Sequence, residues 1–81
     1  MIKRIPPHIL AAARVAAKLS QEDLAARANV SRHTIMRAEE KGVGLESQVA
    51  IEMALKEAGV VIFELEPGSP LFGVREIKGG E

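Results

Sequence analysis

Residues 20–42, SQEDLAARANVSRHTIMRAEEKG, carry enough helix-end signals to predict their local structure without the rest of the chain. Ser20 is a favourable N-cap, and Asp23 stands where a capping box places its acidic residue, so a helix is predicted to begin at Gln21. Asn29 then stands where a short helix needs a residue that tolerates the left-handed conformation. The first half of the stretch is therefore a short helix that ends in a tight turn.

A second helix is predicted over residues 32–41, because Ser31 is another N-cap and Gly42 is a C-terminal stop. At about 100° per residue, Ile35 and Ala38 form a small apolar seam on one side of this helix. The opposite side carries a long polar front made of Arg32, His33, Met36, Arg37 and Glu40. The stretch as a whole is helix, turn, helix, with the front of the second helix available to a polar partner or to water.

The order of residues in this stretch resembles the helix-turn-helix of the Cro/C1-type (XRE-like) transcription regulators. The resemblance rests on Gln21, Glu22, Leu24, Ala25, Ala28, Asn29, Val30, Ser31, Ile35 and Glu39. It extends over roughly residues 8–58 once flanking helices are included. It implies a mainly α, four-helix lambda-repressor-like DNA-binding domain. The chain departs from the family at the turn, where Asn29 replaces the usual glycine.

The resemblance also implies which side chains meet DNA. The family's base-contacting positions fall on Arg32, His33 and Arg37, and Met36 on the same front is suited to touch a thymine methyl group. Phosphate contacts are implied at Gln21, Thr34 and Lys41, with further charge at the rim from Lys18 and Arg27. The plainer interpretation is that each of these is an ordinary solvated side chain on a helix surface.

A structural ion pair is implied between Arg14 and Glu39. Arg14 lies close to the apolar stripe of the preceding helix, which is an awkward place for a charge. In the family, an arginine here pairs with an acidic residue at the position of Glu39. The alternative is that Arg14 extends to water and Glu39 only flanks the seam.

Composition limits the chain to one domain and to a few classes of function. Its 81 residues leave room for one small core, and the absence of cysteine excludes disulfides, thiolate metal sites and a cysteine nucleophile. No apolar run is long enough to span a bilayer, so no membrane partner is expected and a cytoplasmic location is predicted. His8 and His33 are far apart and no catalytic constellation emerges, so neither a metal, a cofactor nor an enzymatic activity is expected.

Charge is distributed unevenly although the net charge is zero. Residues 1–42 carry eight basic and four acidic side chains, a net charge of +4, whereas residues 43–81 have a net charge of −4. The positive half coincides with the helix-turn-helix stretch, which favours a polyanionic partner there. The plainer alternative is two ordinary solvated surfaces.

The flanking segments complete a helical domain. An N-terminal arm is predicted over residues 1–7, with its first five residues loose, because Pro6 and Pro7 prevent an earlier helix start. Helices are predicted over about 8–18 and 45–58. The first is expected to bury Ile9, Leu10, Ala13, Ala16 and Ala17. The last is expected to bury Leu45, Val49, Ala50, Met53, Ala54 and Leu55.

Residues 59–78 are predicted to form a C-terminal β-hairpin, followed by a disordered tail at 79–81. Its strands are expected over 60–65 and 71–77, around a turn rich in Pro and Gly. A lone hairpin is marginal in water, which predicts pairing with a second copy of the chain. The expected dimer interface comprises Val61, Phe63, Leu65, Phe72 and Val74. The alternative is a hairpin that folds back on its own helices.

Three functions follow from these patterns. The leading prediction is a sequence-specific, homodimeric transcriptional regulator that binds double-stranded DNA, acts as a repressor and reads the major groove with the helix at 32–41. The alternative is the antitoxin of a toxin–antitoxin pair, which binds a partner protein and autoregulates through DNA. The third is a helix-turn-helix scaffold that mediates protein contacts only.

Overall fold

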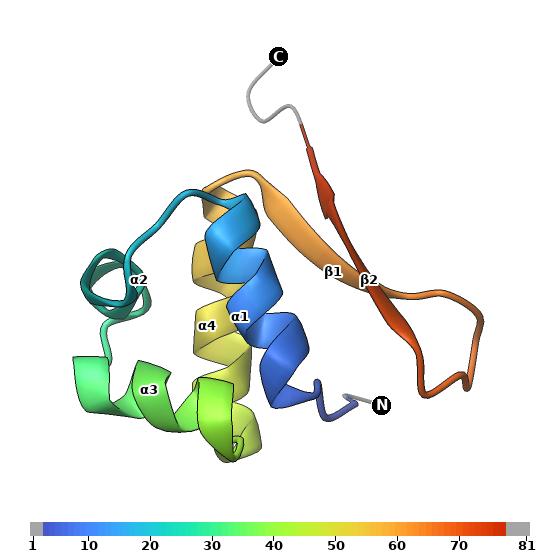
Figure 1. Ribbon diagram of the computed structural model, residues 1–81, viewed down its shortest axis with the longest axis horizontal. Coiled ribbons are helices and arrows are strands. Elements are labelled where there is room, and N and C mark those ends of the chain that lie inside the picture. The colour runs from blue at the N-terminus through green and yellow to red at the C-terminus, as the bar shows by residue number, and fades with distance from the viewer. Residues whose placement is uncertain (1–2, 78–81) are drawn as a thin grey trace.

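The computed structural model describes residues 3–77 as four helices followed by an antiparallel two-stranded hairpin (Figure 1). The elements are α1 (Pro7–Ala16), α2 (Gln21–Ala28), α3 (Arg32–Glu40), α4 (Leu45–Glu57), β1 (Val60–Glu64) and β2 (Phe72–Glu76). This mainly α architecture agrees with the predicted element order. The tail predicted at 79–81 lies outside the described residues, as do the first two residues of the predicted arm.

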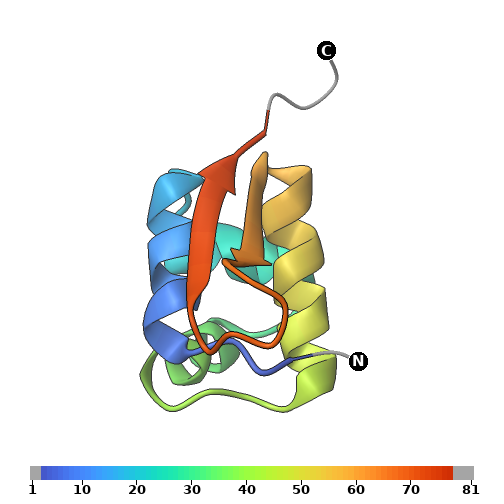
Figure 2. The same ribbon diagram turned by 90° about the vertical axis from the view of Figure 1, so that its right-hand side faces the viewer.

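The elements form three layers. α1 and α4 form the two edges of the middle layer, and the hairpin bridges them on one side, with β2 over α1 and β1 over α4 (Figures 1 and 2). On the other side, α2 packs against α4 while α3 packs against α1 and α2. α3 therefore lies on the side of the molecule away from the hairpin (Figure 1).

The core lies between these layers and consists of aliphatic side chains. Its largest fully buried members are Leu10, Leu24, Ile35, Ile51, Leu55 and Val60. The predicted buried face of α4 is confirmed at Ala54 and Leu55 but wrong at Leu45 and Met53, which are exposed. Gln48 and Ile51 are buried in their place. Apolar residues occur on several sides of α4, so its periodicity does not select one face.

The N-terminal segment is fixed to the domain. The prediction that residues 1–5 are loose is therefore wrong for residues 3–5, the part of this segment that the structure describes. Ile5 is only 7% exposed and belongs to the core. Its backbone N–H donates to Gln48 Oε1 at 2.9 Å, and Gln48 Nε2 donates to the carbonyl oxygen of Lys3 at 2.7 Å. Arg4 donates to the carbonyl oxygen of Val43 at 2.6 Å. Gln48 thus holds a segment that has no secondary structure of its own.

The inner face of the hairpin packs on the helices. Ile62 pairs with Val74 and Glu64 with Phe72, and directly paired residues share one face of a sheet. Ile62, Phe72 and Val74 are partly buried against the helical core. Phe72 and Val74 were predicted to contact a second copy, but the register turns them towards the protein's own helices, as in the alternative of a hairpin that folds back.

The outer face of the hairpin remains uncovered by the described residues. Phe63 and Leu65 are exposed and Val61 is half-buried. The ring of Phe63 lies over Gly73, where any side chain would collide with it. The guanidinium carbon of Arg75 is 5.7 Å from the ring centroid, a distance that permits a cation–π contact. We call Val61, Phe63 and Leu65 the outer hairpin surface.

Candidate nucleic-acid interface

Local capping interactions fix both ends of α2. The Ser20 hydroxyl accepts the backbone N–H of Asp23 at 3.0 Å, and the Asp23 carboxylate accepts the backbone N–H of Ser20 at 3.2 Å, which is a complete capping box. These hydrogen bonds lower the pKa of Asp23 below its ordinary value. At the other end, Asn29 adopts the left-handed conformation with φ 58° and ψ 45°. The capping prediction and the turn prediction are both confirmed.

α3 starts at an equally local signal and is held by a buried seam. The Ser31 hydroxyl accepts the backbone N–H of Thr34 at 3.1 Å, and the two hydroxyl groups are 2.9 Å apart. Ile35 has no exposed surface, and Ala38 is buried beside it. Small residues of α2, Ala25 and Ala28, are buried against the same core, which allows a close approach of the two helices.

The side of α3 opposite this seam is open to solvent. Arg32, His33, Met36 and Arg37 are all exposed, as the sequence predicted for a reading face. We call these four residues the α3 front. Within residues 3–77, neither arginine of the α3 front forms an ion pair with the protein. The guanidinium groups are therefore available to an external acceptor.

The residues predicted to contact phosphate fall on three neighbouring elements. Lys18 and Arg27 are exposed on the α1–α2 connection and in the last turn of α2, and Lys41 is exposed at the end of α3. Thr34 is half-buried because its hydroxyl group faces that of Ser31. The five predicted positions therefore differ in exposure to solvent: three are exposed and two are partly buried.

Gln21 is one of the two partly covered positions, and its side chain has a different contact. Its Nε2 donates to Glu39 Oε1 at 3.3 Å. As the first residue of α2, it still presents a backbone N–H that has no intrahelical acceptor. The structure thus leaves the backbone of Gln21, and not its side chain, available to a phosphate.

Arg14 and Glu39 form the predicted ion pair. Arg14 Nε lies 2.7 Å from Glu39 Oε2 and Arg14 Nη2 lies 3.2 Å from Glu39 Oε1, a bidentate arrangement. Arg14 Nη1 donates to the carbonyl oxygen of Leu19 at 2.9 Å. The pair therefore ties α1, the α1–α2 connection and α3 together behind the α3 front.

One basic residue near this surface was not singled out by the sequence. Arg4 is exposed, and the hydrogen bond to Val43 holds it beside the segment that follows α3. Arg4 and Lys41 line the same shallow pocket of about 210 Å³. The only sequence signal was a basic residue before Pro6, which local patterns do not place relative to α3. Positive charge therefore continues past the C-terminal end of α3.

The fold and this surface define a small, mainly α domain built on helix, turn, helix. No family model matches the chain, and a search of curated proteins finds no similar sequence. Among the described residues, no group of three or more His, Asp and Glu side chains is placed to hold a metal ion. None of the helices within residues 3–77 has both the length and the apolar character needed to cross a bilayer.

Proposed function

We propose that this chain is a sequence-specific, DNA-binding transcriptional regulator that resembles the Cro/C1-type family and reads the major groove with α3. The observation that carries the proposal is the division of α3 into a fully buried seam at Ile35 and an exposed front, whose two arginines form no ion pair with residues 3–77. The major groove of B-DNA is about 12 Å wide and admits one α-helix. A rigid helix with a cationic outer side matches that groove in shape and charge.

The α3 front carries chemistry suited to base edges. Arg32 and Arg37 each offer the bidentate donor geometry that recognises guanine. His33 donates to a purine acceptor, and Met36 contacts a thymine methyl group through its apolar end. These contacts would supply sequence preference, because phosphate contacts alone do not distinguish bases.

The exposed basic residues around α3 supply the non-specific part of the binding. Lys18 and Arg27 are exposed near the two ends of α2, Lys41 and Arg4 are exposed near the C-terminal end of α3, and each neutralised phosphate releases counterions. The affinity for DNA is therefore expected to fall steeply as the salt concentration rises. Such a role belongs to a protein that works beside DNA in the cytoplasm and represses by occupying a promoter or operator.

A symmetric homodimer completes the proposal. The outer hairpin surface presents Phe63 and Leu65 to solvent, while the inner face is already used by the helices. Since α3 lies away from the hairpin, two copies joined through the outer hairpin surface keep both α3 fronts open (Figure 1). A two-fold dimer then reads two half-sites related by the same symmetry.

A second candidate function uses exposed apolar residues of the same hairpin. Leu65 and Leu71, at the ends of the hairpin turn, are both more than half exposed, and an antitoxin would bury such residues against its toxin. In that case the DNA-binding surface serves autoregulation. Mixing the purified chain with a candidate toxin and measuring a stable complex separates this function from a homodimer.

Selection of duplexes from a random DNA pool by the purified full chain tests the leading proposal. We expect enrichment of one sequence with two symmetry-related half-sites. The Arg37→Ala variant should lose that preference, whereas Lys56→Ala, which removes an exposed positive charge at the end of α4, should retain it. Recovery of an unenriched pool by the unmodified chain would contradict the proposal.

A further inference from the structure

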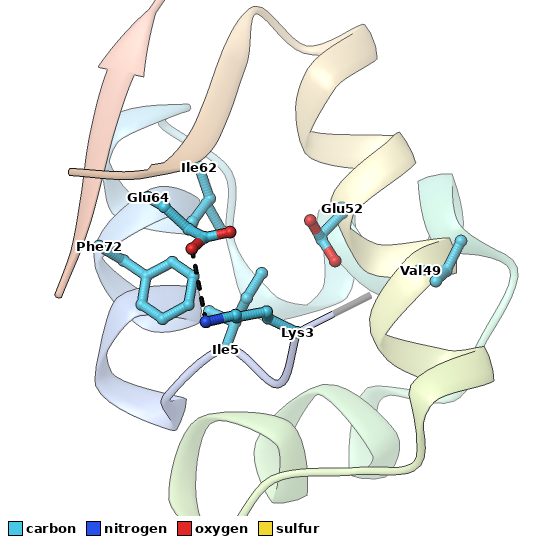
Figure 3. Close-up of a pocket in the computed structure, with 7 residues that line it drawn as sticks. All are labelled: Lys3, Ile5, Val49, Glu52, Ile62, Glu64 and Phe72. Carbon is cyan, nitrogen blue, oxygen red and sulfur yellow. Dashed lines mark ion pairs between the residues drawn. The ribbon is translucent and has the colours of Figure 1, made fainter. Parts of the chain in front are cut away.

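A pocket of about 370 Å³ lies between the N-terminal segment, α4 and the hairpin (Figure 3). This volume falls within the range of about 300–1,000 Å³ that is usual for small-molecule sites. The pocket uses none of the residues of the α3 front. It is therefore a second feature of the molecule, separate from the candidate DNA surface.

The pocket combines an apolar lining with two carboxylates from different elements. Ile5, Val49, Ile62 and Phe72 are its apolar lining residues (Figure 3). Glu52 of α4 and Glu64 of β1 also line the cavity. An anionic ligand would meet two negative charges here. A ligand with an aliphatic body and positively charged ends would match both parts of the lining.

The protein itself places an ammonium group at one of these carboxylates. Lys3 Nζ lies 3.5 Å from Glu64 Oε2 (Figure 3). The two side chains are 40% and 33% exposed, and an ion pair this open to water is weak. Glu64 is thus already placed to accept an ammonium, and the one it holds is bound weakly enough to be replaced.

The second carboxylate has no cation of its own. Glu52 Oε2 accepts a hydrogen bond from Gln48 Nε2 at 3.2 Å, but no basic side chain among the described residues forms an ion pair with Glu52. Its partial burial raises its pKa above the ordinary value, which is the response of a carboxylate that lacks a compensating charge. A cation in the pocket would supply that charge.

We propose that this pocket binds a small aliphatic diamine. One ammonium pairs with Glu52, the other replaces Lys3 Nζ at Glu64, and the methylene chain lies against Ile62 and Phe72. A divalent metal ion fits less well, because only two carboxylates line the pocket and an ammonium already faces one of them. The proposal does not depend on DNA binding.

Calorimetric titration of the full chain with a series of terminal diamines, from diaminopropane to diaminohexane, tests this site. We expect saturable binding that is strongest at one chain length and weaker for aminobutane, which has only one ammonium. Amide chemical-shift changes in NMR spectra should centre on Ile62 and Phe72. Absence of saturable binding, or equal affinity for aminobutane and diaminobutane, would overturn the proposal.

Substitutions in the pocket are expected to change the Kd for the diamine in both directions. Glu52→Gln and Glu64→Gln should each raise the Kd for the best diamine by about tenfold or more, the loss expected for one charge-assisted contact. Glu57→Gln, which removes the same charge from an exposed position of α4 outside the pocket, should leave the Kd unchanged. Lys3→Met should lower the Kd because it removes the competing ammonium. A Kd insensitive to both Glu52→Gln and Glu64→Gln would contradict the assignment.

Discussion

Arg14 and Glu39 illustrate how much depends on single side chains in so small a domain. Their side chains are only 18% and 9% exposed, and Arg14 also donates to the Leu19 carbonyl oxygen. The attraction between two charges that are largely removed from water offsets the hydration that each has lost, so the pair adds little net stability. Removal of one partner leaves the other charge buried without compensation, which lowers the free energy of unfolding. The pair therefore matters most when one member is removed.

We expect Arg14→Met to lower the free energy of unfolding by about 3 kcal/mol, because Glu39 is left without its cation. The double variant Arg14→Met/Glu39→Leu should recover a substantial part of this loss. Urea unfolding followed by circular dichroism measures both effects. A loss below about 1 kcal/mol in the single variant would show that water replaces the guanidinium.

Glu52 is expected to make the stability depend on pH. Because burial raises its pKa in the folded state, the folded state binds the proton more tightly than the unfolded state. The free energy of unfolding should therefore fall as the pH rises from the ordinary pKa of a glutamate through the raised value. The polar groups near Glu52 are Gln48, which donates to it, and Lys3 and Glu64, which line the same pocket. A substitution of Glu52 alone leaves these three side chains unchanged.

Glu52→Gln should remove this fall, so the variant should be more stable than the unmodified chain at neutral pH and equally stable at pH values below the ordinary pKa. Urea midpoints across the acidic range give the comparison, with Glu57→Gln as the control. Parallel stability curves for the Glu52→Gln variant and the unmodified chain would contradict the account.

At the scale of the elements, the turn between α2 and α3 sets the relation of the two helices. Asn29 adopts a left-handed conformation, which costs most residues about 1–2 kcal/mol and glycine almost nothing. We expect Asn29→Ala to lower the free energy of unfolding by about 1 kcal/mol and Asn29→Gly to leave it nearly unchanged. Thermal unfolding of the two variants tests this, and an equal effect of both substitutions would count against it.

The ends of the helices could be predicted from the sequence because their signals are local. Ser20, Asn29 and Ser31 act on backbone groups within a few residues, so their roles do not depend on tertiary structure. Arg14 and Glu39 are distant in sequence, and their pairing was predicted only through the resemblance to a known family.

Features that depend on contacts between distant segments could not be predicted in this way. Ile5 is a core residue in a segment whose backbone Gln48 of α4 binds, and no local pattern connects these two positions. Phe72 was expected in a dimer interface, whereas the strand register turns it towards the helices beneath the hairpin, and local patterns do not fix that register. The pocket under the hairpin follows from the same packing and had no sequence signal.

At the scale of the whole molecule, the hairpin and α3 lie on opposite sides of the α1–α4 pair (Figures 1 and 2). An interface on the outer hairpin surface therefore leaves the α3 front unobstructed. We expect Phe63→Asp to convert dimers to monomers, because it places a charge in the centre of that surface. Analytical ultracentrifugation reports the state, and Met53→Asp, at an exposed position of α4, should leave dimers intact. An unchanged oligomer in Phe63→Asp would remove the hairpin from the interface.

We propose that the α3 front reads DNA bases. The most direct test compares the affinities of the unmodified chain and of the Arg37→Ala variant for the selected duplex. Anisotropy titrations should show a loss of about 1–3 kcal/mol in binding free energy for Arg37→Ala, together with reduced preference over a scrambled duplex. Lys41→Ala should weaken binding to both duplexes alike. If Arg37→Ala leaves both affinity and preference unchanged, α3 does not read bases.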